Sequence, residues 1–339
     1  MKKTAIILAG ILMLTAGVLF LTNSGILEQK VIADTLTEPI KAAVITESEP
    51  AVTYSYPQFY RGLYLAYWSA KDPVRFKKFL SDAKGAHINT FVVDVQPSKN
   101  GECNIPAEHV SEMISNGIHP IARIVCFDQG LRTFPVPESK INFLYTLAEN
   151  SAKAGFKEIQ FDYIRFEDSS ALKKMTLEEK YTFIRSFLNG ARKHLEKYDV
   201  KIAADIFGRI PLNDRDLIGQ KMEVLDEVTD VICPMAYPSH YTWSPKYYND
   251  PYYAVHITSK RARERTKNAK IVSWIQAFEI KIPKSMGYTK YLTEQIQACH
   301  DAEITGYLFW NARQIYTEPL RVMKNYYSTR DLNTGKNLK

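Results

Sequence analysis

The sequence predicts a single (β/α)8 barrel of the α/β class, because short apolar runs rich in β-branched residues alternate with amphipathic stretches from residue 58 to residue 330. The chain has 339 residues with 45% apolar and 12% aromatic content, which suits one large globular domain. Polar and aromatic residues also gather at the C-terminal ends of the apolar runs, where the active sites of such barrels form. We expect residues 331–339 to form a polar tail.

Eight runs have the composition of a buried strand. In chain order they are Gly62–Trp68, Thr90–Gln96, His119–Phe127, Glu158–Phe166, Lys201–Gly208, Val231–Pro238, Lys270–Phe278 and Gly306–Ala312. Between them lie stretches with apolar residues on one helical face, among them Val74–Ala83, Ile141–Ala154, Leu177–Glu196 and Tyr288–Ala302. Strands that alternate with helices pair in parallel, and this region leaves no residues for a second domain.

The first residues differ in composition from the barrel region. Residues 1–3 give a short positive start, and residues 4–22 are uncharged and mostly apolar. We interpret residues 1–22 as an uncleaved signal anchor or a cleaved signal peptide. Residues 23–57 are small, polar or acidic without periodicity and are interpreted as a flexible linker. The barrel is therefore expected outside the cytoplasm, either secreted or attached to the membrane by an uncleaved N-terminal segment.

Charge and cysteine content exclude several classes of protein. The formal charge is +7, but the basic residues are dispersed, and their densest run, residues 260–267, includes Glu264 as a solvated helix face would. We therefore expect no nucleic-acid partner. The four cysteines form no CxxC or Cys/His pattern, so no metal site is expected. Hydrolysis by two carboxylates and water would need no cofactor.

The fourth run contains the most informative carboxylate. Gln160 and Asp162 share one side of a period-two pattern, opposite to Ile159 and Phe161. Burying an unpaired carboxylate costs several kcal/mol, which is comparable to the whole stability of a domain. Asp162 should therefore lie at a strand tip, pair with a cation such as Arg165, or face a wet cavity. Each of these arrangements fits an active site.

Asp162 and Asp205 form the candidate catalytic pair. They occupy equivalent positions near the ends of the neighbouring fourth and fifth runs, and adjacent strands lie about 4.8 Å apart. Carboxyl groups about 5–5.5 Å apart would suit a retaining glycosidase, and a separation of about 6.5–9.5 Å would suit an inverting one. Their proximity should raise the pKa of one of them, as a general acid requires. The competing interpretation is a structural ion pair of Asp162 with Arg165 or Arg123.

Other side chains at the same strand ends are candidate substrate contacts. All four tryptophans, Trp243 included, lie at or just after strand ends, and an aromatic face can stack on the apolar face of a sugar ring. Taken singly, each candidate could equally be a packing residue or a hydrogen-bonded loop residue. The full set of candidate substrate contacts is Trp68, Asp94, Arg123, Tyr163, Arg165, Tyr237, His240, Trp274, Gln276, Trp310 and Asn311.

With these residues in view, the region from about Tyr60 to Tyr316 resembles a bacterial family of glycoside-hydrolase-like barrels that was long known only as a domain of unknown function. The resemblance depends on several strings that occur in the same order, namely Ile121-Ala-Arg-Ile-Val125, Glu158-Ile-Gln-Phe-Asp-Tyr-Ile-Arg-Phe166, Ala204-Asp-Ile-Phe-Gly208, Ile218-Gly-Gln220, Cys233-Pro-Met-Ala-Tyr-Pro-Ser-His-Tyr241, Trp274-Ile-Gln276 and Gly306-Tyr-Leu-Phe-Trp-Asn311. It implies a barrel that acts on a sugar polymer.

The chain departs from the family pattern in three places. Glu167 stands where the family usually has Pro, Gln96-Pro97-Ser98 replaces a Lys and an Asp, and Ala277 replaces an acidic residue. Two carboxylate positions are thereby lost, which could mean a different specificity or a weakened catalyst. Asp162 and Asp205 are retained.

Three functions follow as hypotheses. The leading one is a glycoside hydrolase that acts on a cell-envelope or extracellular polysaccharide through Asp162 and Asp205. The second is a non-catalytic carbohydrate-binding barrel tethered to the membrane, which the lost carboxylates favour. The third is a metal-assisted deacetylase or phosphodiesterase, for which hard ligands could come from Asp94, Asp128, Asp162 and His240.

Overall fold

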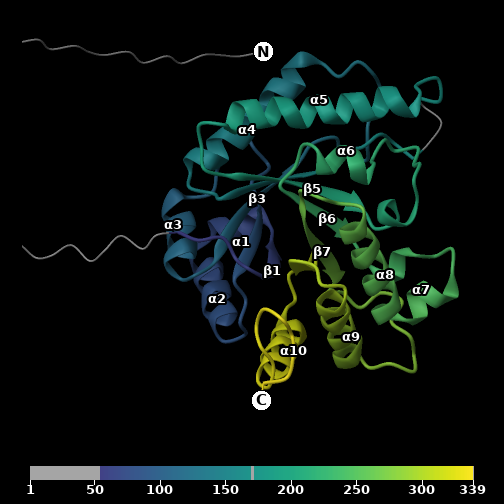
Figure 1. Cartoon of the computed structure of the whole chain (residues 1–339). Coiled ribbons are helices and arrows are strands. Elements are labelled where there is room, and N and C mark those ends of the chain that lie inside the picture. The colour runs from purple at the N-terminus through teal and green to yellow at the C-terminus, as the bar shows by residue number, and fades with distance from the viewer. Residues whose placement is uncertain (1–53, 169–171, 339) are drawn as a thin grey trace, which may run out of the picture. The chain divides into compact units, whose positions relative to one another are not determined.

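The computed structural model describes residues 54–168 and 172–338, and its eight parallel strands close into one barrel (Figure 1). Each strand is followed by at least one helix, so the predicted (β/α)8 fold is confirmed. The predicted N-terminal segment, residues 1–22, and almost all of the linker, residues 23–57, lie outside the described residues. Within the described ranges, no helix is both long enough and apolar enough to cross a membrane.

The strands begin where the sequence predicts but end earlier. They are β1 Tyr60–Leu65, β2 Thr90–Asp94, β3 His119–Val125, β4 Glu158–Asp162, β5 Lys201–Phe207, β6 Val231–Met235, β7 Lys270–Gln276 and β8 Gly306–Trp310. Seven of the eight start at the predicted residue, whereas every C-terminal boundary falls short of the predicted one. The reason is that residues beyond the last strand hydrogen bonds are still buried, as Val95, Phe127 and Phe166 are, so the apolar pattern in the sequence extends past the end of the strand.

Helices surround the barrel and close its outer surface (Figure 1). They are α1 Tyr67–Lys71, α2 Pro73–Lys84, α3 Ala107–Ser115, α4 Glu138–Lys153, α5 Leu177–Leu195, α6 Met222–Asp226, α7 Pro245–Asn249, α8 Pro251–Glu264, α9 Tyr288–Asp301 and α10 Thr317–Tyr327, with short 3-10 turns at Ile210–Leu212 and Pro238–His240. Helix α5, which covers β4, starts at a capping box in which Thr176 and Glu179 bond each other's backbone amides.

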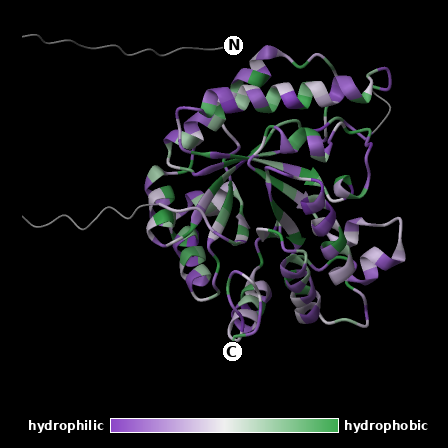
Figure 2. Ribbon diagram, in the orientation of Figure 1, coloured by the Kyte–Doolittle hydropathy of each residue, from purple (hydrophilic) through white to green (hydrophobic). Residues whose placement is uncertain are grey.

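The buried apolar residues form two cores, one between the strands and the helices and one inside the barrel. Figure 2 shows hydrophobic residues along the strands that separate these cores. Outward-facing strand residues such as Ile159 and Phe161 pack against the helices. Inward-facing residues fill the barrel, and they include Val92, Ile121, Ala203, Val231, Val272 and Leu308. Because side chains alternate along a strand, Gln160 and Asp162 point inward with this second core, as the sequence pattern predicts.

The barrel is closed at the N-terminal ends of its strands by a buried polar cluster. Glu158, the first residue of β4, is fully buried and accepts a hydrogen bond from the Tyr60 hydroxyl at 3.0 Å. Its Oε2 also lies 3.1 Å from His119 Nε2, and the other ring nitrogen of His119 contacts the Tyr54 hydroxyl. Tyr56 donates to the backbone carbonyl of Lys157 at 3.1 Å.

Candidate active site

Strands β4 and β5 bring the predicted pair of carboxylates to the C-terminal end of the barrel. Phe161 pairs with Ala204, so the next residues along the two strands, Asp162 and Asp205, lie side by side at the same level. Both side chains are buried, with 4% of Asp162 and 1% of Asp205 exposed. Burial of two neighbouring carboxylates needs a counter-charge, because each alone would lose its hydration.

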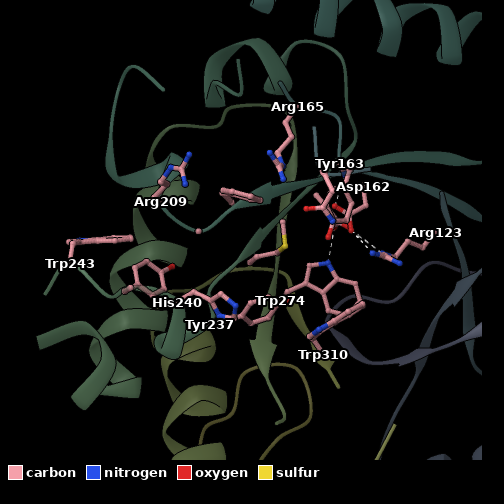
Figure 3. Close-up of a pocket in the computed structure, with 16 residues that line it drawn as sticks. Arg123, Asp162, Tyr163, Arg165, Arg209, Tyr237, His240, Trp243, Trp274 and Trp310 are labelled. Atoms are coloured by element: carbon pink, nitrogen blue, oxygen red, sulfur yellow. Dashed lines mark hydrogen bonds and ion pairs between the residues drawn. The ribbon is translucent and has the colours of Figure 1, made fainter. Parts of the chain in front are cut away.

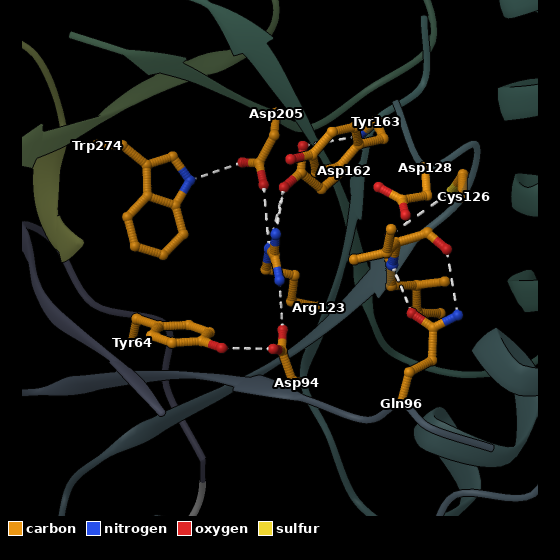
Figure 4. A network of polar contacts seen from close by, with 12 residues as sticks. Tyr64, Asp94, Gln96, Arg123, Cys126, Asp128, Asp162, Tyr163, Asp205 and Trp274 are labelled. Atoms are coloured by element: carbon orange, nitrogen blue, oxygen red, sulfur yellow. Dashed lines mark hydrogen bonds and ion pairs between the residues drawn. The ribbon is translucent and has the colours of Figure 1, made fainter. Parts of the chain in front are cut away.

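Arg123 on β3 supplies that counter-charge (Figure 4). Its Nε and Nη2 donate to Asp162 Oδ2 at 3.1 and 2.5 Å, and its Nη1 donates to Asp94 Oδ1 at 2.5 Å. Asp205 is held less closely, since its Oδ2 lies 3.9 Å from the Arg123 Nε. Both Oδ2 atoms are close to the same Nε, Asp162 Oδ2 at 3.1 Å and Asp205 Oδ2 at 3.9 Å. The distance between these two Oδ2 atoms therefore cannot exceed the sum of these two values. The partner of Asp162 is therefore Arg123 and not Arg165.

The two carboxylates differ in their hydrogen bonds, and Asp205 has a raised pKa. Trp274 Nε1 donates to Asp205 Oδ1 at 2.7 Å, whereas Asp205 Oδ2 is buried without a hydrogen-bond partner among the described residues. Burial, and next the negative charge of Asp162, raise the pKa of Asp205 well above its usual range, against the opposing effect of Arg123. The surroundings of Asp205 thus favour its protonated form.

Arg123 stays charged in this setting. Burial acts to lower the pKa of its guanidinium, but the charges of Asp162, Asp94 and Asp205 outweigh that effect and raise it. Aromatic rings complete its surroundings, with Trp310 at 5.0 Å and Tyr64 at 5.8 Å from the guanidinium carbon. Arg123 therefore acts as a fixed positive charge beneath the site.

A cavity of about 380 Å³ opens above this network and reaches both carboxylates (Figure 3). Its lining includes the catalytic candidates and seven of the predicted substrate contacts, which are Arg123, Tyr163, Arg165, Tyr237, His240, Trp274 and Trp310. Trp243 lies at the outer part of the lining with 56% of its surface exposed. Tyr241 packs against that indole, with ring centres 5.1 Å apart.

Four predicted contacts lie outside the cavity lining. Asp94 bonds Arg123 and accepts from the Tyr64 hydroxyl at 2.5 Å, so it belongs to the network beneath the cavity. Gln276 accepts from the Ser239 backbone amide, and Asn311 donates to the Ala277 carbonyl, so both hold loops. Trp68, on α1, is half exposed and carries the Arg75 guanidinium over its ring at 4.6 Å.

The lining also contains residues that sequence reasoning did not select. Phe207 reaches the cavity from the last position of β5, and Gln129, Gly208 and Arg209 reach it from the loops that follow β3 and β5. Three of them follow Asp205 by only a few residues, and that position just after a strand end was the signal that could have identified them.

Tyr163 connects the strand end to the cavity through an unusual backbone. Its φ is +55°, in the left-handed region that a bulky side chain rarely adopts, and its amide donates to Asp162 Oδ1 at 2.6 Å. Such a conformation costs of order 1–3 kcal/mol and persists where the surroundings hold it. Here it turns the chain sharply after Asp162 and places the Tyr163 ring in the cavity lining.

His240 faces the cavity from the loop after β6. Burial, with a smaller effect of nearby Lys281, lowers the pKa of its imidazole below the usual value, so the ring is neutral at physiological pH. In residues 54–168 and 172–338, no group of three or more His, Cys, Asp or Glu side chains is arranged to hold a metal ion. The four ligands considered for a metal-assisted reaction, Asp94, Asp128, Asp162 and His240, are thus not assembled into one site.

Solved structures with the same fold include several enzymes of carbohydrate breakdown. The glycoside hydrolase domain of PgaB (BpsB) from Bordetella bronchiseptica has a TM-score of 0.60 at 10% identity, over 78% of this chain and 98% of that one. The endo-β-1,4-mannanase from Thermotoga petrophila has a TM-score of 0.60 at 13% identity, over 84% and 78%. The spore cortex-lytic enzyme SleL from Bacillus megaterium has a TM-score of 0.55 at 11% identity, over 81% and 75%. At these identities the likeness concerns the fold alone.

No curated protein sequence matches the chain. A family match is found, however, over residues 133–316, which make up more than half of the chain and contain both Asp162 and Asp205. The matched family is described as "Putative glycosyl hydrolase domain", in agreement with the resemblance seen in the sequence. The chain belongs to this glycosyl hydrolase domain family.

Proposed function

We propose that this barrel is a glycoside hydrolase that cleaves a polysaccharide of the cell envelope or of the extracellular space. The observation that carries the proposal is the unequal bonding of two adjacent buried carboxylates to one arginine. Arg123 donates two hydrogen bonds to Asp162, whereas Asp205 has a raised pKa and one oxygen without a hydrogen-bond partner in the described part of the chain. An ionised carboxylate beside a protonated one is the arrangement that hydrolysis of a glycosidic bond requires.

Each carboxylate then has a role in the first step. Asp205, protonated, gives its proton to the glycosidic oxygen as the bond from that oxygen to the anomeric carbon breaks. The positive charge that develops on the sugar ring is met by the carboxylate of Asp162, either as a nucleophile or as a charge stabiliser. Arg123 keeps Asp162 in place for this encounter through the bonds at 3.1 and 2.5 Å.

A water molecule completes the reaction. After the leaving group departs, Asp205 is a carboxylate and can take a proton from the water as its oxygen bonds the anomeric carbon. If Asp162 has formed a covalent glycosyl ester, this step breaks it and retains the configuration at that carbon. Both carboxylates return to their starting protonation states, so the cycle needs only the substrate and water.

The aromatic residues of the lining support a sugar ligand. Trp310 and Trp274 meet edge to face with ring centres 5.6 Å apart next to the carboxylates, and Trp243 presents an exposed face farther out. Such faces stack on the apolar side of sugar rings. Two further structures with the same fold, the protein YKL-39 and a chitinase from Cycas revoluta, were solved with chitooligosaccharides. Our proposal places the barrel outside the cytoplasm, tethered if residues 1–22 are uncleaved.

The test compares two substitutions at the carboxylates with a distant control. Asp162→Asn and Asp205→Asn should each abolish release of reducing ends from bacterial envelope glycans while leaving glycan binding within a few-fold of wild type. Asp214→Asn is the control, since that side chain is 94% exposed. Retention of wild-type turnover by both carboxylate variants would remove the pair from the mechanism.

A second candidate function is a non-catalytic carbohydrate-binding barrel. It is favoured by the way Arg123 already engages both Asp162 and Asp94, as a purely structural network would. The same experiment separates the two functions. A wild-type protein that binds an envelope glycan and releases no reducing ends from it, at any pH between about 4 and 8, would be the binding barrel.

A further inference from the structure

Two arginines flank one aromatic ring in the cavity lining. The guanidinium carbons of Arg165 and Arg209 lie 4.6 and 4.9 Å from the centre of the Phe207 ring. Figure 3 shows both arginines on one side of the cavity, across from Tyr237 and His240. Neither arginine has a part in the carboxylate network described above.

The charges of the two arginines are compensated very differently. Arg209 donates to Asp216 at 2.7 Å and to Asp168 at 2.8 Å, so two carboxylates neutralise it. Arg165 has no carboxylate oxygen within 4.0 Å among residues 54–168 and 172–338. The one hydrogen bond of its guanidinium in this part of the chain runs from Nη1 to the Phe166 carbonyl at 3.2 Å, and its buried Nε has no partner there.

Arg165 is nevertheless removed from bulk water. Only 8% of its surface is exposed, and that burial lowers the pKa of its guanidinium, which still carries its charge at neutral pH. A Cβ at Gly130 would lie 2.7 Å from Nη1, so the absence of a side chain at that position gives the guanidinium its room. A buried cation without a counter-ion is unfavourable, and such groups are normally paired.

We propose that the cavity accepts a glycan carrying a negatively charged substituent, and that Arg165 pairs with that substituent. The inference rests on the proposed function in taking the ligand to be a glycan. A uronic-acid carboxylate and a phosphate ester share the required chemistry, because both present oxygens that a guanidinium binds through parallel hydrogen bonds. The ring of Tyr163, 5.5 Å from the Arg165 guanidinium carbon, lies beside the carboxylates, so the charged sugar would occupy a site next to the bond that is cleaved.

The charge of the whole chain agrees with an anionic ligand. Its formal net charge of +7 attracts a polyanion at long range, and the dispersed basic residues add no competing local site. Arg165 would then select the charged unit at short range. Long-range attraction is screened by salt, whereas the pairing inside the cavity is screened much less.

The experiment measures binding of matched glycan pairs to the full chain by calorimetry. One pair is tetragalacturonate and its methyl ester, and the other is chitotetraose with and without a 6-phosphate group. We expect wild type to bind at least one charged member about 10- to 100-fold tighter than its neutral partner. Arg165→Gln should remove that preference and leave the affinity for the neutral partner within about two-fold.

Two further variants make the result specific. Arg165→Lys keeps the charge without the planar fork and should retain part of the preference. Arg185→Gln removes an equal charge from an ion pair with Glu227 on the helical exterior and should leave the preference intact. The pair that shows the preference identifies the substituent as a carboxylate or a phosphate.

Several outcomes overturn the inference. They are equal affinity of wild type for both members of each pair, absence of binding to all four glycans, and equal loss of charged and neutral binding in Arg165→Gln. The proposed function is judged separately, by turnover. A charged glycan that binds preferentially and is not cleaved would contradict the hydrolase proposal and leave this inference standing. Cleavage of glycans by a wild-type protein that binds the charged and neutral members of each pair equally would contradict this inference and leave the hydrolase proposal standing.

Discussion

Strand β4 carries a buried acidic residue at each end, and the two ends differ in what surrounds the carboxylate. Glu158, at the closed end, is fully buried against Tyr60 and His119. Asp162, four residues later on the same inward face, bonds Arg123 and lines a cavity. Burial of an acid is thus common to both ends, and the distinguishing features are a cavity and a second carboxylate beside it.

The comparison teaches that burial of a charged group is a weak sign of function unless a ligand can reach it. At the closed end, a hydroxyl and an imidazole bond Glu158 Oε2, while its Oε1 is buried without a hydrogen-bond partner among the described residues, and Glu158 does not line the cavity. At the open end, the arginine is shared between acids, and Asp205, which also has an oxygen without a hydrogen-bond partner among the described residues, lines the cavity. The following predictions test this contrast, starting from the largest expected effect.

Substitution of the two ends of β4 should affect different properties. Asp162→Asn should lower turnover by about 10³-fold or more, because it removes the charge that faces the developing cation. Glu158→Ala should leave turnover per folded molecule within about three-fold and lower the free energy of unfolding by about 3 kcal/mol, because it unpairs buried donors. Denaturant unfolding of both variants measures the free energy of unfolding, and a reducing-end assay measures their turnover. Comparable turnover losses would show that the two ends are not functionally distinct.

Removal of Arg123 should damage both stability and activity. Arg123→Gln leaves the buried Asp162 and the partly buried Asp94 without their shared cation, and breaking a buried pair in this way costs about 3–5 kcal/mol. Arg61, at the closed end, is the matched control, since among the described residues its guanidinium donates to backbone carbonyls alone, those of Phe59, His87 and Leu332. We expect Arg61→Gln to lower stability without changing the pH dependence of turnover. A fully stable Arg123→Gln variant would contradict the network.

Asp205 should make stability depend on pH in a definite direction. A carboxyl whose pKa is raised in the folded state contributes stability that is present below its unfolded pKa, near 3.8, and is lost as the pH rises toward the folded value. Asp205→Asn cannot ionise, so its stability relative to wild type should increase as the pH rises above about 4. Urea unfolding of both proteins at a series of pH values measures this. A difference that does not change with pH would mean that Asp205 is ionised in the fold.

The pH dependence of turnover should also reflect the ionisation of Asp205. Wild-type activity should fall on the alkaline side, as Asp205 loses the proton that it donates. The bell-shaped profile of kcat/KM gives the apparent pKa of the pair of carboxylates, not that of one residue. An alkaline limb that persists in a partly active Asp205→Asn variant would assign that limb to another group.

The smallest effect is expected at the rim of the open end. Trp243→Ala should change the free energy of unfolding by less than about 0.5 kcal/mol, because more than half of the indole is exposed. Glycan affinity should nevertheless fall by about 5- to 30-fold if the indole stacks on a sugar ring. Trp68→Ala, equally exposed but outside the cavity, is the control and should leave affinity unchanged.

The fold and the central pair of carboxylates were accessible from the sequence, because both depend on periodicity. Alternation placed Asp162 and Asp205 on inward faces at the same height of neighbouring strands. The partner of Asp162 was harder to identify, since Arg165 is close in sequence, whereas Arg123 is brought in by the pairing of β3 with β4. The left-handed turn at Tyr163 follows Asp162 directly, and a sequence pattern does not reveal such a turn.

The polar residues at other strand ends show a second limit. Gln276 and Asn311 have the same residue types that bind sugars, yet in the structure they bond the backbones of neighbouring loops. Nothing in their spacing separates a loop-holding amide from one that binds a ligand. Arg209 shows the opposite case, because it lines the cavity although the sequence analysis did not select it. It lies in a loop, and the path of a loop cannot be predicted from hydrophobic periodicity.

The closed end of the barrel also determines where the chain enters the domain. Tyr54 contacts His119, and the Tyr56 ring lies under the Lys201 ammonium group at 3.7 Å, so the first described residues are fixed to the starts of β3 and β5. The cavity lies at the other ends of the strands. The chain therefore enters the barrel domain at the end opposite to the cavity, so the first described residues lie away from the site where a polymer would bind.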